Sequence, residues 1–233
     1  MGAPLLVEYY QQLPRRRAKD DPDRWRKRQA DAYEAFKKHA HERYTEGTLL
    51  RLLESPDADA RRAALLALSL FGTMQANAAV AGRLRDGDAE VRQLAVDTLW
   101  SLWFQADSEE NNQELQRLAR LRDRDAALAG LDHLVLKAPG FAEAYNQRAI
   151  LAFRLKQFER SIADCEKVLQ LNPFHFGAQA GMAQCYMQLR KHRAALKAFR
   201  NALRINPHLD GVADTVRALE TALGEEGRKD DKK

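Results

Sequence analysis

The sequence predicts an all-α fold in which pairs of helices stack along the chain as a solenoid. Three observations predict this fold. Pro139, Pro173 and Pro207 recur at intervals of 34 residues, and each follows an apolar-periodic run. A second pattern recurs upstream with an offset of 31 residues, and no segment alternates apolar and polar residues as a strand does. Because one helix pair cannot bury its apolar face alone, repeats of this kind must stack on their neighbours.

Composition agrees with a self-sufficient globular chain. A chain of 233 residues buries roughly 70% of its unfolded surface and needs no disulfide or metal to fold. Its 38 basic and 33 acidic residues leave a net charge of +5, which argues against nucleic acid as the main partner. Cys165 and Cys185 are too few for a disulfide scaffold, and we expect both in the core.

The sequence predicts a protein without a membrane span. No stretch approaches the ~20 apolar residues that a membrane helix needs, and the first residues lack a basic segment ahead of an apolar one. We therefore expect a soluble, cytoplasmic protein by default. Export remains the alternative if a leader has been removed.

The first region, residues 1–45, is expected to hold an extension and one packing helix. Residues 1–20 are expected to be irregular or lightly helical. Over residues 22–44, Pro22 suits a first helical turn, and we expect this helix to cover the open end of the solenoid. Its apolar stripe at helical spacing consists of Trp25, Tyr33, Phe36, Ala40 and Tyr44. The basic runs 15–17 and 24–28 suggest contact with nucleic acid or an anionic membrane, but the intervening aspartates favour a solvated face.

Residues 46–106 hold the pattern that is offset by 31 residues. Asp57 aligns with Asp88 and Arg61 with Arg92, and each aspartate is placed to cap the helix that follows it. The two copies resemble HEAT repeats. In that family an aspartate six residues before the arginine often pairs between neighbouring repeats. Asp86 has this spacing from Arg92, whereas Ser55 stands at the matching place of the first copy.

Residues 108–223 hold the 34-residue units and a final capping helix, and residues 224–233 form a tail that is expected to be disordered. The units begin at residues 108, 142 and 176 and resemble tetratricopeptide repeats, in which two helices fill each unit. The resemblance implies a right-handed superhelix. The matching residues of the second and third units are Tyr145, Ala149, Phe158, Ser161, Val168, Ala183, Tyr186, Ala195, Phe199 and Ala202. The first unit fits less well, because Asn111 and Leu115 depart from the pattern.

The resemblance implies that the first helix of each unit lines a concave groove. The groove residues that it implies are Asn112, Gln116, Arg120, Asn146, Ile150, Phe153, Arg154, Ala180, Gln184 and Met187. Their amides can pair with the backbone of an extended peptide, and Phe153 is the natural anchor. The alternative is that Ile150 and Phe153 pack against the neighbouring repeat.

One subclass of the resembled family binds chaperone carboxylates through clustered basic residues. The equivalent positions of this chain hold Asn112, Gln116, Gln147, Gly177 and Gly181. The absence of basic residues there argues against that use.

The sequence predicts a non-enzymatic scaffold that binds a protein or peptide partner. It contains no HExxH, Walker A, GxGxxG or GxSxG motif, and His39 and His41 are spaced so that they do not converge on a metal. We expect no catalytic residue, cofactor, metal or small-molecule substrate. One alternative is a HEAT-type protein that binds nucleic acid or acts as a lyase- or glycosylase-like enzyme. Another is a structural subunit of a larger assembly, including a homo-oligomer.

Overall fold

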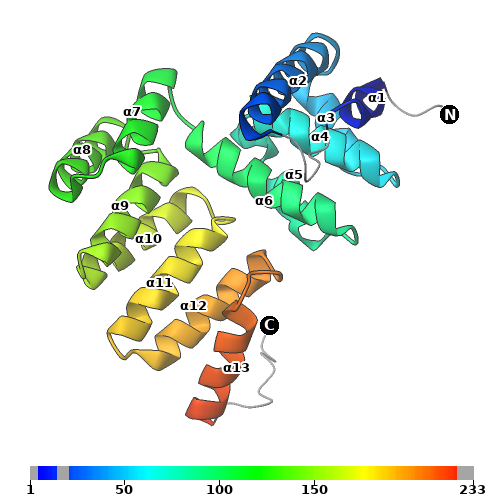
Figure 1. Ribbon diagram of the computed structural model, residues 1–233. Helices are drawn as coiled ribbons and strands as arrows, with labels where there is room; N and C mark the ends of the chain where they lie inside the picture. Colours follow the sequence, from blue (N-terminus) through cyan, green and yellow to red (C-terminus); the bar gives the residue numbers. More distant parts are fainter. Residues whose placement is uncertain (1–4, 15–20, 225–233) are drawn as a thin grey trace. The chain divides into compact units, whose positions relative to one another are not determined.

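The computed structural model describes residues 5–14 and 21–224, and every regular element in these ranges is a helix (Figure 1). The predicted all-α class of stacked helix pairs is confirmed. The chain forms two compact units, residues 1–102 and residues 103–233, and each is described by itself. The expected basic run 15–17 and the expected tail beyond residue 224 lie outside the described residues. Among the described helices, none is both long and apolar enough to cross a lipid bilayer.

The first unit is built around α4, which is buried along most of its length. Its elements are α1 (Leu5–Gln11), α2 (Pro22–Arg43), α3 (Glu46–Leu52), α4 (Ala58–Phe71), a 3-10 turn (Met74–Ala76), α5 (Asn77–Gly82), a second 3-10 turn (Arg83–Arg85) and α6 (Ala89–Phe104), whose last two residues belong to the second unit. Helices α1, α2 and α3 pack on α4. Helix α6 also meets α4, because the buried Thr98 hydroxyl donates to the Leu65 carbonyl oxygen at 3.0 Å.

The packing helix predicted over residues 22–44 is α2. The Asp21 carboxylate caps it by accepting a hydrogen bond from the backbone N–H of Arg24 at 2.9 Å, and Pro22 occupies the first turn. Trp25, Phe36 and Ala40 are buried, so most of the predicted stripe faces the unit's interior. Within the residues expected to be irregular or lightly helical, residues 5–11 form the short helix α1.

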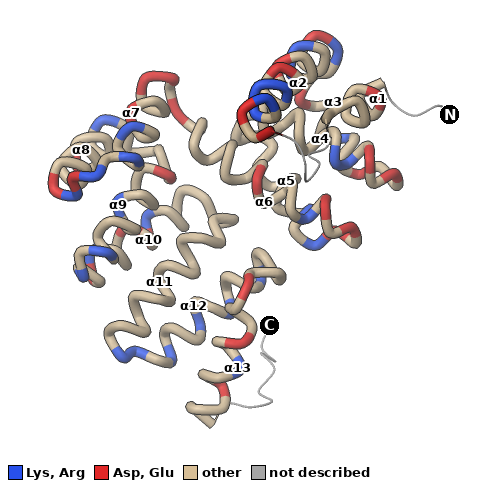
Figure 2. Tube along the Cα trace, in the orientation of Figure 1, with Lys and Arg blue, Asp and Glu red and all other residues tan. Residues whose placement is uncertain are grey.

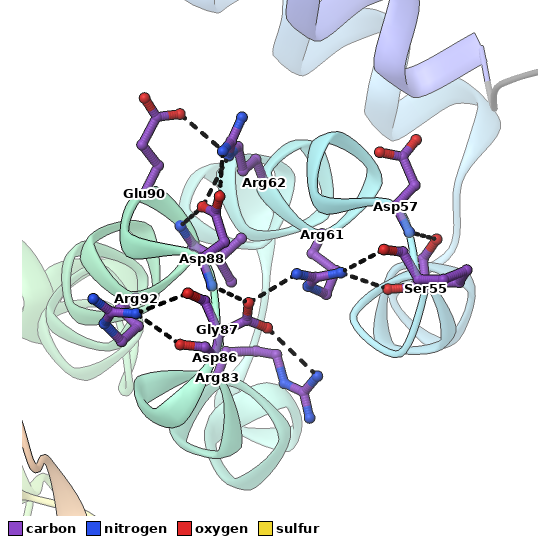
Figure 3. Close-up of polar contacts among 12 residues, drawn as sticks. Ser55, Asp57, Arg61, Arg62, Arg83, Asp86, Gly87, Asp88, Glu90 and Arg92 are labelled. Carbon is purple, nitrogen blue, oxygen red and sulfur yellow. Dashed lines mark hydrogen bonds and ion pairs between the residues drawn. The ribbon is translucent and has the colours of Figure 1, made fainter.

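The 31-residue offset corresponds to a repeated polar contact, shown in Figure 3. Arg61 donates through Nη1 to the carbonyl oxygen of Ser55 at 2.8 Å, and Arg92 donates in the same way to Asp86 at 2.8 Å. Because the acceptor is a backbone carbonyl, serine serves as well as aspartate at this place. The predicted caps are also present, since Asp57 accepts from the N–H of Asp59 and Asp88 from that of Val91, each at 2.9 Å.

The two copies are joined by ion pairs that run from one to the next. Arg61 Nη2 lies 2.8 Å from Asp86 Oδ1, and Arg62 Nη2 lies 2.6 Å from Asp88 Oδ2 (Figure 3). The contact between neighbouring units that the HEAT resemblance implies is therefore formed by Arg61. The identity of these helix pairs as HEAT repeats stays a prediction.

The Asp86 carboxylate is held in its ionised form. Burial acts to raise its pKa, but the hydrogen bonds from Arg61 and from the backbone N–H of Asp88 outweigh burial, so the pKa lies below its ordinary value. The side chains of Arg61 and Asp86 are only 13% and 5% exposed, so water screens this pair less than a surface pair.

The second unit is a stack of three helix pairs closed by one further helix (Figure 1). Its elements are α7 (Glu109–Arg120), α8 (Arg124–Lys137), α9 (Ala142–Arg154), α10 (Phe158–Leu171), α11 (Phe176–Gln188), α12 (His192–Ile205) and α13 (Val212–Leu223). Each proline of the 34-residue register follows a helix end, as predicted. Lys156 and Arg190 lie at the same place in successive repeats, and both adopt left-handed backbone angles, with φ of 60° and 55°.

Neighbouring pairs share apolar clusters and ion pairs made by arginines, of which Arg148 contacts the most helices. Buried residues of α9, α10 and α11 form one cluster, including Ala149, Val168 and Ala178. Arg148 donates to Asp164 through Nε at 2.9 Å and Nη2 at 2.6 Å. The same side chain reaches Asp132 of α8 through Nη1 at 2.9 Å, so one arginine connects α8, α9 and α10.

We predict that Asp86→Asn lowers the free energy of unfolding by about 2 kcal/mol at pH 7, because Arg61 and Arg83 then face a neutral group. The folded-state pKa of Asp86 lies below the unfolded one. Its stabilising contribution is therefore complete above the unfolded pKa and is lost as pH falls through the folded pKa. Urea unfolding of both proteins should show the difference shrinking below about pH 4.

The control is Asp23→Asn, which removes an exposed pair with Arg26 and should change stability little. Equal destabilisation by the two variants, or a difference that does not change with pH, would contradict the assignment of Asp86.

Candidate functional site

The predicted groove residues lie on α7, α9 and α11, the first helices of the three pairs, and their exposure differs. Asn112 and Asn146 are buried. Half-buried positions are Gln116, Phe153, Ala180 and Met187, and exposed positions are Arg120, Ile150, Arg154 and Gln184. Eight of the ten predicted residues are therefore exposed or half-buried, and only the amides of Asn112 and Asn146 are buried.

The amide of Asn112 is engaged at the start of its own helix. Its Oδ1 accepts a hydrogen bond from the backbone N–H of Asp107 at 3.1 Å, and its Nδ2 donates to the Asp107 carbonyl oxygen at 2.9 Å. Buried and partnered in this way, the side chain stabilises the chain's entry into α7. The expectation that Asn112 pairs with a ligand backbone does not fit this geometry.

Asn146 belongs to a buried polar cluster centred on Glu143 of α9. Glu143 Oε1 accepts hydrogen bonds from Asn146 Nδ2 at 2.9 Å and Gln147 Nε2 at 2.7 Å. Its Oε2 lies 2.9 Å from Nε2 of His175. Both Glu143 and His175 have side chains that are 0% exposed. The amide of Asn146 thus holds the carboxylate in place and does not face a groove.

The ring of His175 has a defined protonation site. Its Nδ1 accepts a hydrogen bond from the backbone N–H of Ala178 at 3.0 Å, so the ring proton must lie on Nε2 and is donated to Glu143. His175 is the N-cap of α11. Trp103 stacks on the ring with a centroid distance of 4.1 Å.

The sequence analysis missed this cluster. Glu143 and His175 lie in neighbouring repeats, 32 residues apart, and the 34-residue register alone does not show that their side chains meet. The cluster links α9 to α11, and its acid and its imidazole, Glu143 and His175, are closed to solvent.

A pocket of about 240 Å³ opens between α7, α8 and α9. Its lining includes the predicted groove residues Ile150 and Arg154, together with Leu121, Arg122 and Arg124. The buried Leu118 contributes to the lining and packs so closely on α8 that a Cβ on Gly130 would lie 2.3 Å from its Cδ2. Glycine at that position therefore allows α7 and α8 to approach.

Ile150 and Phe153 differ in how far they are available to a ligand. Ile150 is 36% exposed at the edge of the pocket. Phe153 is half-buried, and its ring meets that of Phe158 in its own repeat, edge to face, with centroids 5.6 Å apart. Ile150 faces the neighbouring pair α7–α8 across the pocket, and the alternative that both residues pack against a neighbouring repeat stays a prediction.

The two cysteines lie in the core of the stack, as predicted. The thiol of Cys185 donates to Ser161 Oγ at 3.2 Å. Burial raises the pKa of Cys165 to about 12. Neither thiol is placed to react with a solvent-borne reagent. In the described part of the chain, no three side chains of the metal-binding types gather at one point.

Comparison with known proteins identifies tetratricopeptide repeats in the second unit. The tetratricopeptide repeat family models match residues 142–175 and 177–209. These ranges contain α9–α10 and α11–α12, the two units in which the sequence pattern is strongest. The first predicted unit folds as the pair α7–α8 but lies outside both matched ranges.

Two similar curated proteins share the same region. A TPR repeat-containing protein of Rhizobium etli is 39% identical over 82 residues, which are 35% of this chain and 40% of that protein. Sperm-associated antigen 1 of Mus musculus is 32% identical over 88 residues, or 38% of this chain and 10% of that protein. The chain thus spans less than half the length of these relatives.

Similar solved structures cover about half of the chain. The first TPR of Spaghetti (RPAP3) bound to HSP90 peptide SRMEEVD is 22% identical, with a TM-score of 0.43, and covers 50% of this chain and 89% of that one. The Arabidopsis OM64 TPR domain is 18% identical, with a TM-score of 0.45, and covers 48% and 93%.

We predict that neither thiol reacts with Ellman's reagent at pH 8 while the protein is folded, because both are buried and carry raised pKa values. Two thiols per chain should react quickly once urea has unfolded the protein. A thiol that reacts at the same rate before and after unfolding would place a cysteine at the surface and contradict the packing described.

Proposed function

We propose that this chain is a protein-interaction module that binds an extended peptide or a partner helix along α7, α9 and α11. The observation that carries the proposal is the partial exposure of Ile150, an apolar residue in the middle helix, in a pocket that exposed arginines also line. Such exposed apolar contacts, rimmed by polar groups, are typical of surfaces that bind a partner.

The remaining groove residues support the same role. Gln116 and Gln184 each offer an amide that can donate to and accept from a peptide backbone. Phe153 and Met187 are half-buried, so each keeps apolar surface at the groove while its base is fixed by packing. Methionine adapts its shape to the side chain that it contacts. The proposed contact set therefore combines directional amides with adaptable apolar surface.

The contact set is smaller than the one predicted from sequence. It comprises Gln116, Arg120, Ile150, Phe153, Arg154, Ala180, Gln184 and Met187. Asn112 and Asn146 are left out because their amides are buried and partnered. They enter the proposal as supports for α7 and α9.

We predict that Ile150→Ser weakens peptide binding about tenfold, because it removes a central apolar contact. Peptides would be selected from a random displayed library on the purified chain, and their affinities measured by fluorescence polarisation. Thermal unfolding followed by circular dichroism would verify that the variant folds.

Leu136→Ser is the matched control, because Leu136 of α8 is 80% exposed and does not line the pocket. This control should leave the affinity unchanged. Selected peptides that bind both variants equally well, or a chain that selects no peptide, would refute the proposed groove.

A further inference from the structure

We propose that the pocket between α7, α8 and α9 receives the apolar side chain of an acidic peptide segment, while arginines at its rim bind the flanking carboxylates. This inference rests on the proposed function and gives it a partner chemistry. The arginines are Arg122 in the α7–α8 connection, Arg124 at the start of α8 and Arg154 at the end of α9.

The buried residues that line the pocket are all apolar. Leu118 and Leu131 are each 2% exposed and Leu151 is 8% exposed, and all three contribute to the lining. Three large apolar side chains among the described residues are exposed, and two of them, Leu121 at 36% and Ile150 at 36%, line this pocket. An apolar side chain placed here would cover both and would remove their surface from water.

The rim carries positive charge that the described residues do not neutralise. Among the described residues, no ion pair or hydrogen bond is formed by the side chains of Arg122, Arg124 and Arg154. By contrast, Arg148 and Arg200 of the same unit pair with carboxylates. Arg120, exposed at the end of α7, adds a further positive charge close by in the chain. Figure 2 shows the Lys and Arg positions around α8 in blue.

Two carboxylates lie close to these arginines in the chain and reduce the positive charge of the rim. Asp123 caps α8, and its Oδ1 accepts hydrogen bonds from the N–H groups of Asp125 and Ala126 at 3.0 Å each. Asp125 is exposed in the first turn of α8, where its charge complements the positive helix end. With Arg120 and Arg154 included, four arginines stand against two aspartates, so the rim retains an excess of positive charge.

The size and chemistry of the site favour a peptide. At about 240 Å³, the pocket is smaller than the ~300–1,000 Å³ of typical small-molecule sites, and it suits a single anchoring side chain. Guanidinium groups bind carboxylates in bidentate geometry. Nucleic acid would bind the arginines but would gain little from the buried apolar side chains of the pocket.

The arrangement does not call for the C-terminal carboxylate of a partner. The rim arginines lie in two separate places: at the start of α8 with the connection before it, and at the end of α9. This separation suits side-chain carboxylates on both sides of an apolar residue. We therefore expect an internal peptide segment, with two acidic residues on each side of an apolar residue, to bind with the same affinity as that segment at a C-terminus.

The test uses a fluorescein-labelled peptide, acetyl-Asp-Glu-Leu-Asp-Glu, with an amidated C-terminus, and fluorescence polarisation against the full chain. Comparison peptides carry a free C-terminus, serine in place of leucine, or asparagine and glutamine in place of the acids. We expect the amidated and free peptides to bind equally. The serine peptide should bind several-fold more weakly, and the uncharged peptide at least tenfold more weakly.

The protein variants separate rim charge from overall charge. Combining Arg122→Gln, Arg124→Gln and Arg154→Gln should weaken binding of the acidic peptide at least tenfold and reduce its salt dependence. The control combines Lys27→Gln, Lys38→Gln and Lys197→Gln, which remove the same charge at exposed positions outside the pocket lining, and it should change the affinity less than twofold.

The inference would be overturned by equal binding of the uncharged peptide, by an equal effect of the control lysine substitutions and the arginine substitutions, or by displacement of the peptide by oligothymidine at lower concentration than by unlabelled peptide. If the acidic peptide fails while library-selected peptides bind in an Ile150-dependent way, the proposed function stands and only the partner chemistry is wrong. If both peptide classes fail, both proposals fall.

Discussion

Each helix pair of the second unit can bury its apolar side only against the next pair, and small side chains let the helices come close enough to do so. Ala149 and Ala183 occupy the same place in successive repeats and are 2% and 0% exposed. A larger side chain at either position would overpack the crossing and push the helices apart. The stack, the exposure of the first helices and the pocket beside Ile150 all depend on this close approach.

Apolar burial alone does not fix how neighbouring helix pairs are oriented. Polar contacts between the pairs fix that orientation. In the first unit, Arg61 and Arg62 connect one helix pair to the next through Asp86 and Asp88. In the second unit, Arg148 bridges Asp132 and Asp164. In both units a guanidinium with several donors binds more than one neighbouring segment at once, which a lysine could not do with the same geometry.

The buried Glu143 cluster shows how position in the stack decides what a polar residue does. Asn146 and Gln147 are adjacent in sequence and both donate to Glu143. Asn146 is buried, whereas Gln147 remains half-buried and lines the pocket. One face of α9 thus carries both the interior support and part of the proposed binding surface, so a substitution there would change packing and binding together.

The sequence by itself determined the helices and their order. The proline register and the small residues predicted α9 to α12, and the caps at Asp57 and Asp88 were predicted from residue type and position, because helix ends and amphipathic faces depend on residues only a few positions apart. Only the tertiary structure decided that Asn112 and Asn146 turn inward, that His175 meets Glu143, and that three arginines with no ion pair among the described residues line one pocket with buried leucines. These contacts join helices that are distant in sequence, and their side-chain directions depend on how the pairs pack. A one-residue shift along a helix turns its buried face by about 100°, so the linear pattern could not specify these contacts.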